Sequence, residues 1–175
     1  MPSLLLVPIY FSDRHAMLDP LAARLQATFG LDVHVRPPWF DPEIPFDPSR
    51  GQYNSTLFLA QILKGLREEP RRVLGVTSVD LFIPVLTFVF GEAQLSGRAA
   101  VVSTHRLRTE AYGLEPDEAL LGERLDKEAI HELGHTYGLV HCASTRCVMR
   151  SSTYVEEIDL KSAEFCPSCR AALPP

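Results

Sequence analysis

The histidines of residues 131–141, in the stretch HELGHTYGLVH, constrain the local fold more than any other part of the chain. His131 and His135 are four positions apart, so on an α-helix their side chains project from one face, about 6 Å apart along the axis. The segment before them has apolar residues at helical spacing, which predicts that helix. Gly138 can adopt the left-handed conformation that ends a helix. We therefore expect the chain to turn there and to bring His141 back towards the other two histidines.

Three imidazoles brought together in this way would form a zinc site with an open coordination position. Zinc in catalytic sites has three protein ligands and leaves the fourth position to water. Glu132 lies one position round the helix, and we expect it to be an exposed cleft residue that reaches such a water without binding the metal. The H-E-x-x-H pattern alone is short enough to occur by chance. The alternative is a helix with ordinary, partly exposed histidines, but the added glycine and third histidine favour a metal site.

The four cysteines all lie C-terminal to the first of these histidines, in two closely spaced pairs. The apolar start MPSLLLVPIYFSD has no basic n-region and no small-residue cleavage site, so we expect a cytoplasmic protein. Thiols stay reduced in that compartment, and paired thiolates at this spacing are typical of a structural zinc site. The alternative is two disulfides or four idle thiols. The expected ligands of this second zinc are Cys142, Cys147, Cys166 and Cys169.

The segment HELGHTYGLVHCASTRCVMR, followed by CPSC, resembles the archaemetzincins, a group of small metallopeptidases within the metzincins. The segments TFVFGEA and VVSTHRLR are similar to family segments upstream of the helix. The resemblance implies two zinc ions per chain, one catalytic and one held by the four cysteines. Without it, Met149 could equally be core filler. The roles it implies are catalytic zinc ligands for His131, His135 and His141, general base for Glu132, turn glycine for Gly138, and the Met-turn methionine beneath the metal for Met149.

Hydrophobic periodicity predicts an α+β fold with an α/β-like upper lobe. The first strand, helix and second strand form a β-α-β unit, so a parallel strand pair is expected. We expect a twisted, mixed five-stranded sheet with backing helices, an active-site helix, and an irregular C-terminal lobe stapled by zinc. The predicted strands are residues 3–11, 31–37, 71–83, 87–95 and 98–107, and the predicted helices are residues 18–30, 55–69 and 115–138.

The domain organisation follows from length and from the distribution of breaker residues. A chain of 175 residues that is 46% hydrophobic suits a single domain, residues 1–175, with a buried core. We expect an upper lobe over residues 1–138 and a lower lobe over residues 139–175, with the cleft between them. Residues 36–52 carry five prolines and predict a surface loop, after which Ser55 is the expected N-cap of the next helix.

The charge balance disfavours several classes of partner. The net charge is −5 and no run of Lys and Arg stands out, so neither nucleic acid nor an anionic membrane is an expected partner. Lys161 and Arg170 supply too little positive charge for nucleic-acid binding through the cysteine-rich tail. The apolar N-terminal run is too short to span a bilayer. We expect a monomer whose partner is a peptide or protein substrate.

Zinc-dependent hydrolysis of peptide bonds is the function that these motifs favour, with Glu132 as general base. The alternative is a non-catalytic zinc-binding scaffold or interaction module. Residues 87–95 could bind substrate by strand addition or be an ordinary sheet strand. Tyr154 could reach the cleft as an oxyanion donor, although an ordinary surface tyrosine is the preferred interpretation. The remaining histidines, interpreted as strand-end or surface residues, are His15, His34 and His105.

Overall fold

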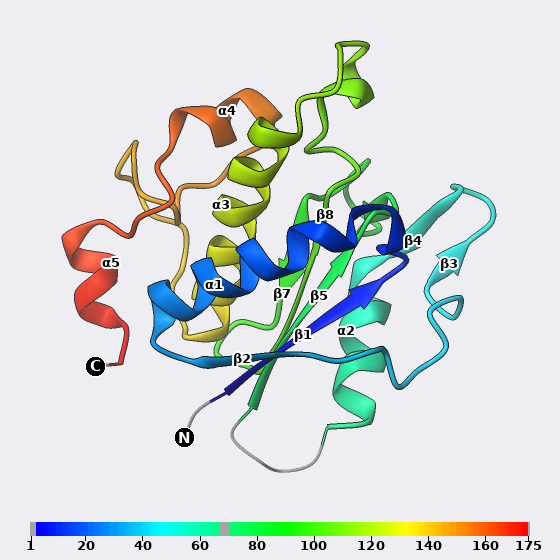
Figure 1. The fold of residues 1–175 in the computed structure, drawn as a ribbon, viewed down its shortest axis with the longest axis horizontal. Helices are drawn as coiled ribbons and strands as arrows, with labels where there is room; N and C mark the ends of the chain where they lie inside the picture. The colour runs from blue at the N-terminus through cyan, green and yellow to red at the C-terminus, as the bar shows by residue number, and fades with distance from the viewer. Residues whose placement is uncertain (1–2, 67–70, 175) are drawn as a thin grey trace.

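The structure is a computed structural model that describes residues 3–66 and 71–174. Its centre is a five-stranded sheet in the order β2-β1-β5-β8-β7, as Figure 1 shows. The first four strands in this order are parallel to one another, and β7 runs antiparallel to β8. The predicted mixed sheet and the α+β class are therefore confirmed. The strands are β1 (Ser3–Ile9), β2 (Asp32–Val35), β5 (Arg71–Thr77), β7 (Gly91–Ala93) and β8 (Ala99–Ser103).

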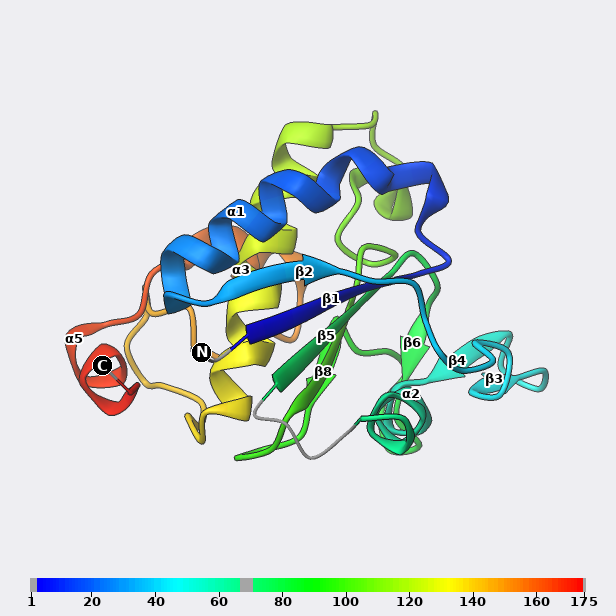
Figure 2. The same ribbon diagram turned by 60° about the horizontal axis from the view of Figure 1, so that its bottom comes forward.

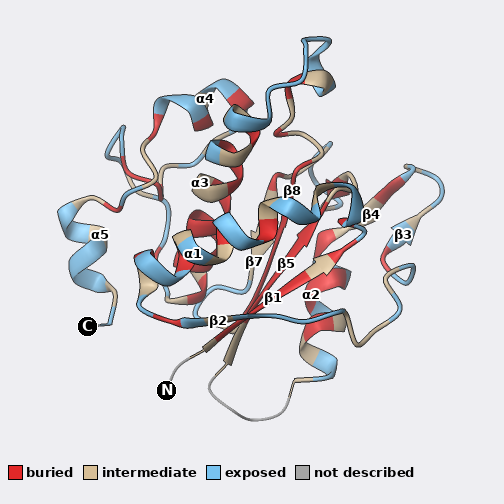
Figure 3. Cartoon of the chain, in the orientation of Figure 1, coloured by how far each residue is buried: buried red, intermediate tan, exposed pale blue. Residues whose placement is uncertain are grey.

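Helices cover both faces of this sheet. α1 (Leu18–Phe29) and α3 (Glu118–Thr136) pack on one face, and α2 (Ser55–Lys64) packs on the other, as the turned view of Figure 2 shows. Because successive side chains of a strand point to opposite faces, β1 contributes to both hydrophobic clusters. The three central strands β1, β5 and β8 therefore contain long apolar runs, and Figure 3 shows most of their residues as buried.

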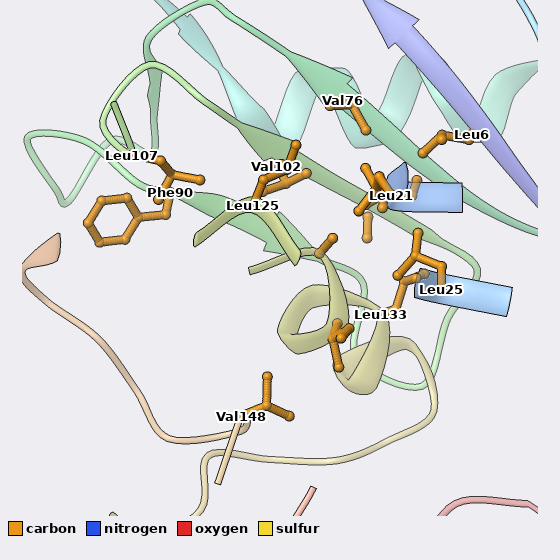
Figure 4. Close-up of a cluster of buried hydrophobic side chains, with 14 of the residues drawn as sticks. Leu6, Leu21, Leu25, Val76, Phe90, Val102, Leu107, Leu125, Leu133 and Val148 are labelled. Carbon is orange, nitrogen blue, oxygen red and sulfur yellow. The ribbon is translucent and has the colours of Figure 1, made fainter. Parts of the chain in front are cut away.

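The larger hydrophobic cluster lies between the sheet and the α1–α3 pair. Figure 4 shows Leu21 and Leu25 of α1 facing Leu125 and Leu133 of α3, and all four are almost fully buried. Each such leucine contributes about 1.5–3 kcal/mol through the removal of its side chain from water. Val148, from the C-terminal segment, belongs to the same cluster. The segment after the histidine helix is thus partly anchored in the main core.

The structure differs from the sequence predictions in the region around residues 36–54. This region is not only a loop, because it contributes two short strands to a second sheet in the order β3-β4-β6. The side chain of Gln52 is buried and donates to the Asp80 carboxylate, which draws the segment against the β5–β6 connection. The three strands are β3 (Phe46–Asp47), β4 (Gln52–Asn54) and β6 (Leu81–Phe82).

Two further boundaries were predicted wrongly. Asn54, not Ser55, is the N-cap of α2, because its side chain accepts the backbone N–H of Leu57. The predicted strand 87–95 is reduced to the three residues of β7, since Val89 forms a bridge to Leu81 of the second sheet before the chain joins β8. The second outcome depends on a contact with β6, whereas the N-cap of α2 is formed by a local hydrogen bond.

The C-terminal region contains two short helices, α4 (Val155–Leu160) and α5 (Pro167–Ala172), where irregular structure was expected. No residue of α5 is buried, and the helix lies at the periphery in Figure 3. Single 3₁₀ segments precede α1 (η1, Ser12–Met17) and α3 (η2, Thr109–Tyr112). Within the described residues, no helix combines the length and the apolar character needed to cross a membrane.

Candidate active site and metal centres

The first two histidines of the motif lie in the last two turns of α3. The N-cap of this helix is Asp117, whose side chain accepts the backbone N–H of Leu120 and so caps the first turn. The packing of α3 against β7 and β8 holds its C-terminal half beside the edge of the sheet. His131 is buried and His135 half-buried, whereas His141, beyond the helix, is exposed. The predicted helix is confirmed, with its last helical residue at Thr136.

The turn at Gly138 brings the third histidine to the first two. Its φ of 91° lies in the left-handed region that favours glycine. The backbone N–H of Gly138 donates to the His135 carbonyl, and that of Leu139 donates to the Gly134 carbonyl. This pair of bonds is the Schellman arrangement that ends helices. The chain reverses as the sequence predicts, and the ring of His141 comes to 5.3 Å from that of His131, measured between centroids.

Backbone carbonyl groups orient two of the three imidazoles. Nδ1 of His131 lies 2.8 Å from the carbonyl oxygen of Val148, and Nδ1 of His135 lies 2.7 Å from that of Leu139. An Nδ1–H that donates to a carbonyl leaves Nε2 as the atom for a metal, which is the usual arrangement around metal-binding histidines. The two Nε2 atoms are 3.1 Å apart. The same turn that places His141 therefore also sets the orientation of His135.

The geometry of the three histidines fits a zinc ion. Ligand atoms of His131, His135 and His141 all lie within 4.8 Å of one another. Two nitrogen atoms bound to one tetrahedral zinc at ~2.0 Å would be roughly 3.3 Å apart, close to the separation of the two helical Nε2 atoms. Burial lowers the pKa of His131 well below its ordinary value and also lowers that of His135. Both effects favour the neutral imidazole, which is the form that binds metal.

Glu132 faces the same site but is buried, so the expectation of an exposed side chain was wrong. It retains 6% of its surface and lies against Gly91 of β7, where an added Cβ would come within 2.9 Å of Glu132 Oε1. Burial raises the pKa of Glu132 well above its ordinary value, and the nearby charge of Glu128 acts in the same direction. Gly91 therefore makes room for this carboxyl, and a glycine inside a strand pattern is the sequence signal for such a close approach.

A cleft with a cavity volume of about 440 Å³ opens beside these side chains. One wall consists of residues 87–91, which include the start of β7, and the other consists of residues 151–154. His131, Glu132 and His141 line it between the two walls. β7 is the last strand in the order of the sheet, so among the described strands none pairs with its outer edge. Tyr154 lines the cleft and is 66% exposed, consistent with a surface tyrosine.

The four cysteines form a second cluster behind the turn. Their sulfur atoms all lie within 4.8 Å of one another, and each is a thiol rather than half of a disulfide in this structure. The Cys142 and Cys166 sulfur atoms are 3.8 Å apart, about the ~3.8 Å expected for two thiolates at ~2.3 Å from a tetrahedral zinc. The backbone N–H of Cys169 lowers the pKa of Cys166 to about 7, which favours the metal-binding thiolate. The cluster as a whole is Cys142, Cys147, Cys166 and Cys169.

Met149 is fully buried and packs directly against the histidine helix. An added Cβ at Gly134 would lie 2.5 Å from the Met149 sulfur, so only glycine allows this approach. The Met149 carbonyl accepts the backbone N–H of Cys142, which ties the methionine turn to the residue after His141. Met149 therefore packs against the histidine helix and is joined to Cys142 by a backbone hydrogen bond. Sequence alone gave no reason to single out Gly134.

Replacement of Gly134 by alanine is expected to destabilise the protein by about 1–3 kcal/mol, the usual cost of overpacking a core. The matched control is Gly122→Ala on the same helix, where the nearest atom outside the helix, Met17 Cε, is 3.9 Å from the added Cβ. There alanine should stabilise by about 0.5–1 kcal/mol, because glycine is a poor helix residue. Urea unfolding of both variants measures the difference. Equal stability of the two would contradict the close packing described here.

A buried ion pair next to the site was not predicted from the sequence. Lys161 Nζ lies 2.8 Å from Glu128 Oε1, with both side chains almost fully buried, and it also donates to the Arg150 carbonyl. The pair joins α3 to the segment after the methionine turn. Glu128 lines the cleft one helical turn before Glu132. The only sequence signal was that four-residue spacing of two glutamates, and Lys161 is distant in sequence.

The remaining histidines lie outside both metal-ligand clusters found among the described residues. His15 and His34 are exposed, as predicted. His105 is half-buried, with its Nε2 4.0 Å from the Asp80 carboxylate and its Nδ1 close to the Ser78 carbonyl. It was expected at a strand end or on the surface, and it lies two residues after Ser103, the last residue of β8.

Comparisons with known proteins agree in the family that they indicate. The family model described as peptidase family M54 matches residues 49–174. Archaemetzincin of Methanocaldococcus jannaschii is 49% identical over 153 residues, which cover 87% of this chain and 83% of that protein. Archaemetzincin of Methanopyrus kandleri is 48% identical over 132 residues, which cover 75% of this chain and 71% of that protein.

Solved structures extend this similarity to almost the full chain. The crystal structure of archaemetzincin from Archaeoglobus fulgidus, complexed with malonate, aligns with a TM-score of 0.83 at 36% identity and covers 99% of this chain and 100% of that one. The structure of archaemetzincin from Methanopyrus kandleri aligns with a TM-score of 0.82 at 39% identity and covers 98% of this chain and 92% of that one. The similarity therefore includes the N-terminal strands and helix that precede the matched residues of the family model.

Proposed function

This chain belongs to peptidase family M54, and on that premise we propose that it hydrolyses peptide bonds at a zinc ion bound by His131, His135 and His141. The resemblance to archaemetzincins noted in the sequence is thereby confirmed, and the chain is a zinc metallopeptidase. The observation that carries the site assignment is the convergence of three imidazoles, two of which line one cleft together with a buried carboxyl.

The chemistry divides between the metal and the chain's own residues. Zinc, when bound, would polarise the scissile carbonyl and lower the pKa of a water molecule. Glu132 accepts the proton of the attacking water and later delivers it to the leaving amine nitrogen. Gly91 leaves space for the Glu132 carboxyl, and the Val148 and Leu139 carbonyl groups hold two of the imidazoles.

A second zinc at the cysteine cluster would have a structural role. Four thiolates complete a tetrahedral shell and leave no position for water or substrate. α5, which carries Cys169, has no buried residue, so zinc–thiolate bonds would replace a hydrophobic core in holding it. Cys142 follows His141 directly, and the structural metal would therefore also restrain the third catalytic ligand. The two lobes, residues 1–138 and 139–175, act as one metallopeptidase domain in this proposal.

The substrate is a peptide or protein segment, in keeping with the peptidase family. Gly91, the first residue of the edge strand β7, lines the cleft together with the residues before it, and this segment could add a substrate strand through main-chain hydrogen bonds. Tyr154, at the opposite wall, is available to a bound chain. We propose that the protein acts as a monomer without nucleic-acid or membrane partners, in line with its net charge of −5.

The direct test is hydrolysis of a mixed peptide library by the zinc-loaded protein, followed by mass spectrometry. Cleavage should stop when a chelator removes the catalytic metal and return when zinc is added. Magnesium should not restore it, because histidine ligands suit zinc and oxygen ligands suit magnesium. Cleavage that persists in metal-free protein would refute the proposal.

Two zinc ions per chain are expected, and they should leave in a fixed order. The histidine site has an open position and loses its ligands as they protonate, so it should release zinc first as the pH falls. Since burial lowers the pKa of His131 and His135, this release should begin below the ordinary histidine value of ~6.5. Elemental analysis after dialysis at a series of pH values measures the stoichiometry. A fully loaded protein with one zinc, or equal loss from both sites, would contradict this.

A further inference from the structure

A second cavity, of about 270 Å³, lies apart from the catalytic cleft and shares no lining residue with it. It forms where the C-terminal ends of α1 and α3 meet α5 and the start of β5. The end of α1 and α5 lie at the left of the molecule in Figure 1. Tyr137, in its wall, stands between His135 and the turn glycine Gly138. The residues that line it are Phe29, Gly30, Leu31, Arg72, Tyr137, Arg170, Leu173 and Pro174.

The two arginines of this cavity are held in place by the protein. The Arg72 guanidinium lies 3.6 Å from the centre of the Tyr137 ring, and its Nε donates to the Thr136 hydroxyl. Arg170 donates from Nη1 to the Thr28 carbonyl, and its guanidinium lies 5.5 Å from the centre of the Phe165 ring. Each of these bonds uses one of the five N–H donors of a guanidinium. Both cations are therefore oriented before any ligand arrives.

The charge of the cavity wall is one-sided. None of the described residues that line it is acidic, so two positive charges face the space without a lining carboxylate. Guanidinium groups bind carboxylates through paired, charge-assisted hydrogen bonds. The same charges disfavour an ammonium group at this position. The cavity should therefore favour a ligand that has a carboxylate and no ammonium group close to that carboxylate.

The rest of the wall is apolar and limits the size of the ligand. Phe29, Leu31, Leu173 and Pro174 offer hydrophobic surface next to the two arginines, and Phe29 stacks on Tyr137 with ring centroids 5.4 Å apart. The volume is slightly below the range of about 300–1,000 Å³ typical of sites for drug-sized ligands. One apolar amino-acid residue with its carboxylate is of suitable size.

We propose that this cavity binds the free carboxylate and apolar side chain of a peptide's C-terminal residue, with Arg72 and Arg170 as the carboxylate ligands. Because none of the described lining residues is acidic, the cavity favours a residue whose nitrogen is acylated, as within a peptide, over a free amino acid with its ammonium group. The inference does not depend on catalysis, since the cavity and the cleft have separate walls.

Isothermal titration of the zinc-loaded protein with three small probes tests the proposal. N-acetyl-leucine imitates a C-terminal residue, N-acetyl-leucinamide lacks the carboxylate, and leucine carries an ammonium group. N-acetyl-leucine should bind, and each of the other two should bind at least about tenfold more weakly, as expected when a charge-assisted bond is lost or a like charge is added. If no binding of N-acetyl-leucine is detected at ligand concentrations up to ~10 mM, where even a very weak affinity would be measurable, the proposal is wrong.

Two variants locate the binding site. Arg170→Gln, on the exposed face of a peripheral helix, should weaken N-acetyl-leucine binding by at least about tenfold and leave the melting temperature nearly unchanged. His141→Ala removes a catalytic zinc ligand and should leave the affinity unchanged. If His141→Ala abolishes binding and Arg170→Gln does not, the carboxylate binds at the catalytic metal, and the proposed cavity site is wrong. The rate of peptide hydrolysis in these variants tests the catalytic proposal, whereas the affinity for N-acetyl-leucine tests the cavity proposal.

Discussion

The Glu132→Gln variant is expected to retain both zinc ions and to hydrolyse peptides at least about 100-fold more slowly than the parent protein. Glutamine preserves the size of the side chain against Gly91 but cannot accept the proton of the attacking water. A positioned general base typically contributes a factor of about 10²–10⁴. The three imidazoles and their carbonyl partners are unchanged, so the metal should remain. Peptide cleavage rates and zinc content, measured on the same preparation, give the two readouts.

The stability of this variant gives a second, independent result. Burial raises the pKa of Glu132, so in the zinc-free protein the ionised carboxylate opposes folding. Its unfavourable contribution is absent below the unfolded pKa of ~4.3 and grows as the pH rises towards the folded pKa. Glutamine carries no such charge. At pH 7 the zinc-free variant should therefore melt no lower than the parent, and the two melting temperatures should converge near pH 4.

His141→Ala is the matched comparison for the activity measurement. This change removes an exposed metal ligand, so zinc at the histidine site and activity should be lost together. Glu132→Gln should separate them, with metal kept and activity lost. If Glu132→Gln cleaves as fast as the parent protein, Glu132 is not the base. The alternative of a non-catalytic zinc-binding scaffold predicts instead that neither variant differs from the parent in hydrolysis.

The histidine site could be predicted from sequence because its determinants are local. The four-residue spacing of His131 and His135 and the helix-ending glycine are properties of one short segment, and hydrogen bonds within that segment form the turn. The three central strands β1, β5 and β8 were also predictable, since buried strands are apolar runs whatever their partners. The pairing of the cysteines in space followed from their spacing and from the resemblance to a known family.

Features set by distant contacts could not be predicted in the same way. β7 is short because Val89 bridges to Leu81, and the burial of Glu132 depends on its approach to Gly91. The partner of Glu128 is Lys161, which is more than thirty residues away and lies between Cys147 and Cys166 in the sequence. Local propensity carries no information on which strand edge or which cation will lie next to a given side chain. A single sequence therefore indicates the ligands of the site more readily than its walls.

The Cys166→Ser variant is expected to lose the second zinc and to melt at a markedly lower temperature than the parent. A hydroxyl is a poor replacement for a thiolate ligand, and metal binding at such a site contributes directly to folding. The loss should be uneven along the chain. Val148, Met149 and Ile158 are buried in the main core and should stay ordered, whereas α5, with no buried residue, should detach. Hydrogen exchange of the zinc-loaded proteins distinguishes these segments.

The effect should extend to catalysis through the link between Cys142 and His141. Cys142 would be held by the structural zinc and by its bond to the Met149 carbonyl, and release of the first restraint should weaken metal binding at the histidine site. Ser168→Ala, an exposed position in the same CPSC segment, is the control and should change neither zinc content nor melting temperature. If Cys166→Ser keeps two zinc ions and the parent melting temperature, the cysteines are not a folding site. If it loses one zinc but keeps full activity, the cluster stabilises α5 alone and does not position the third histidine.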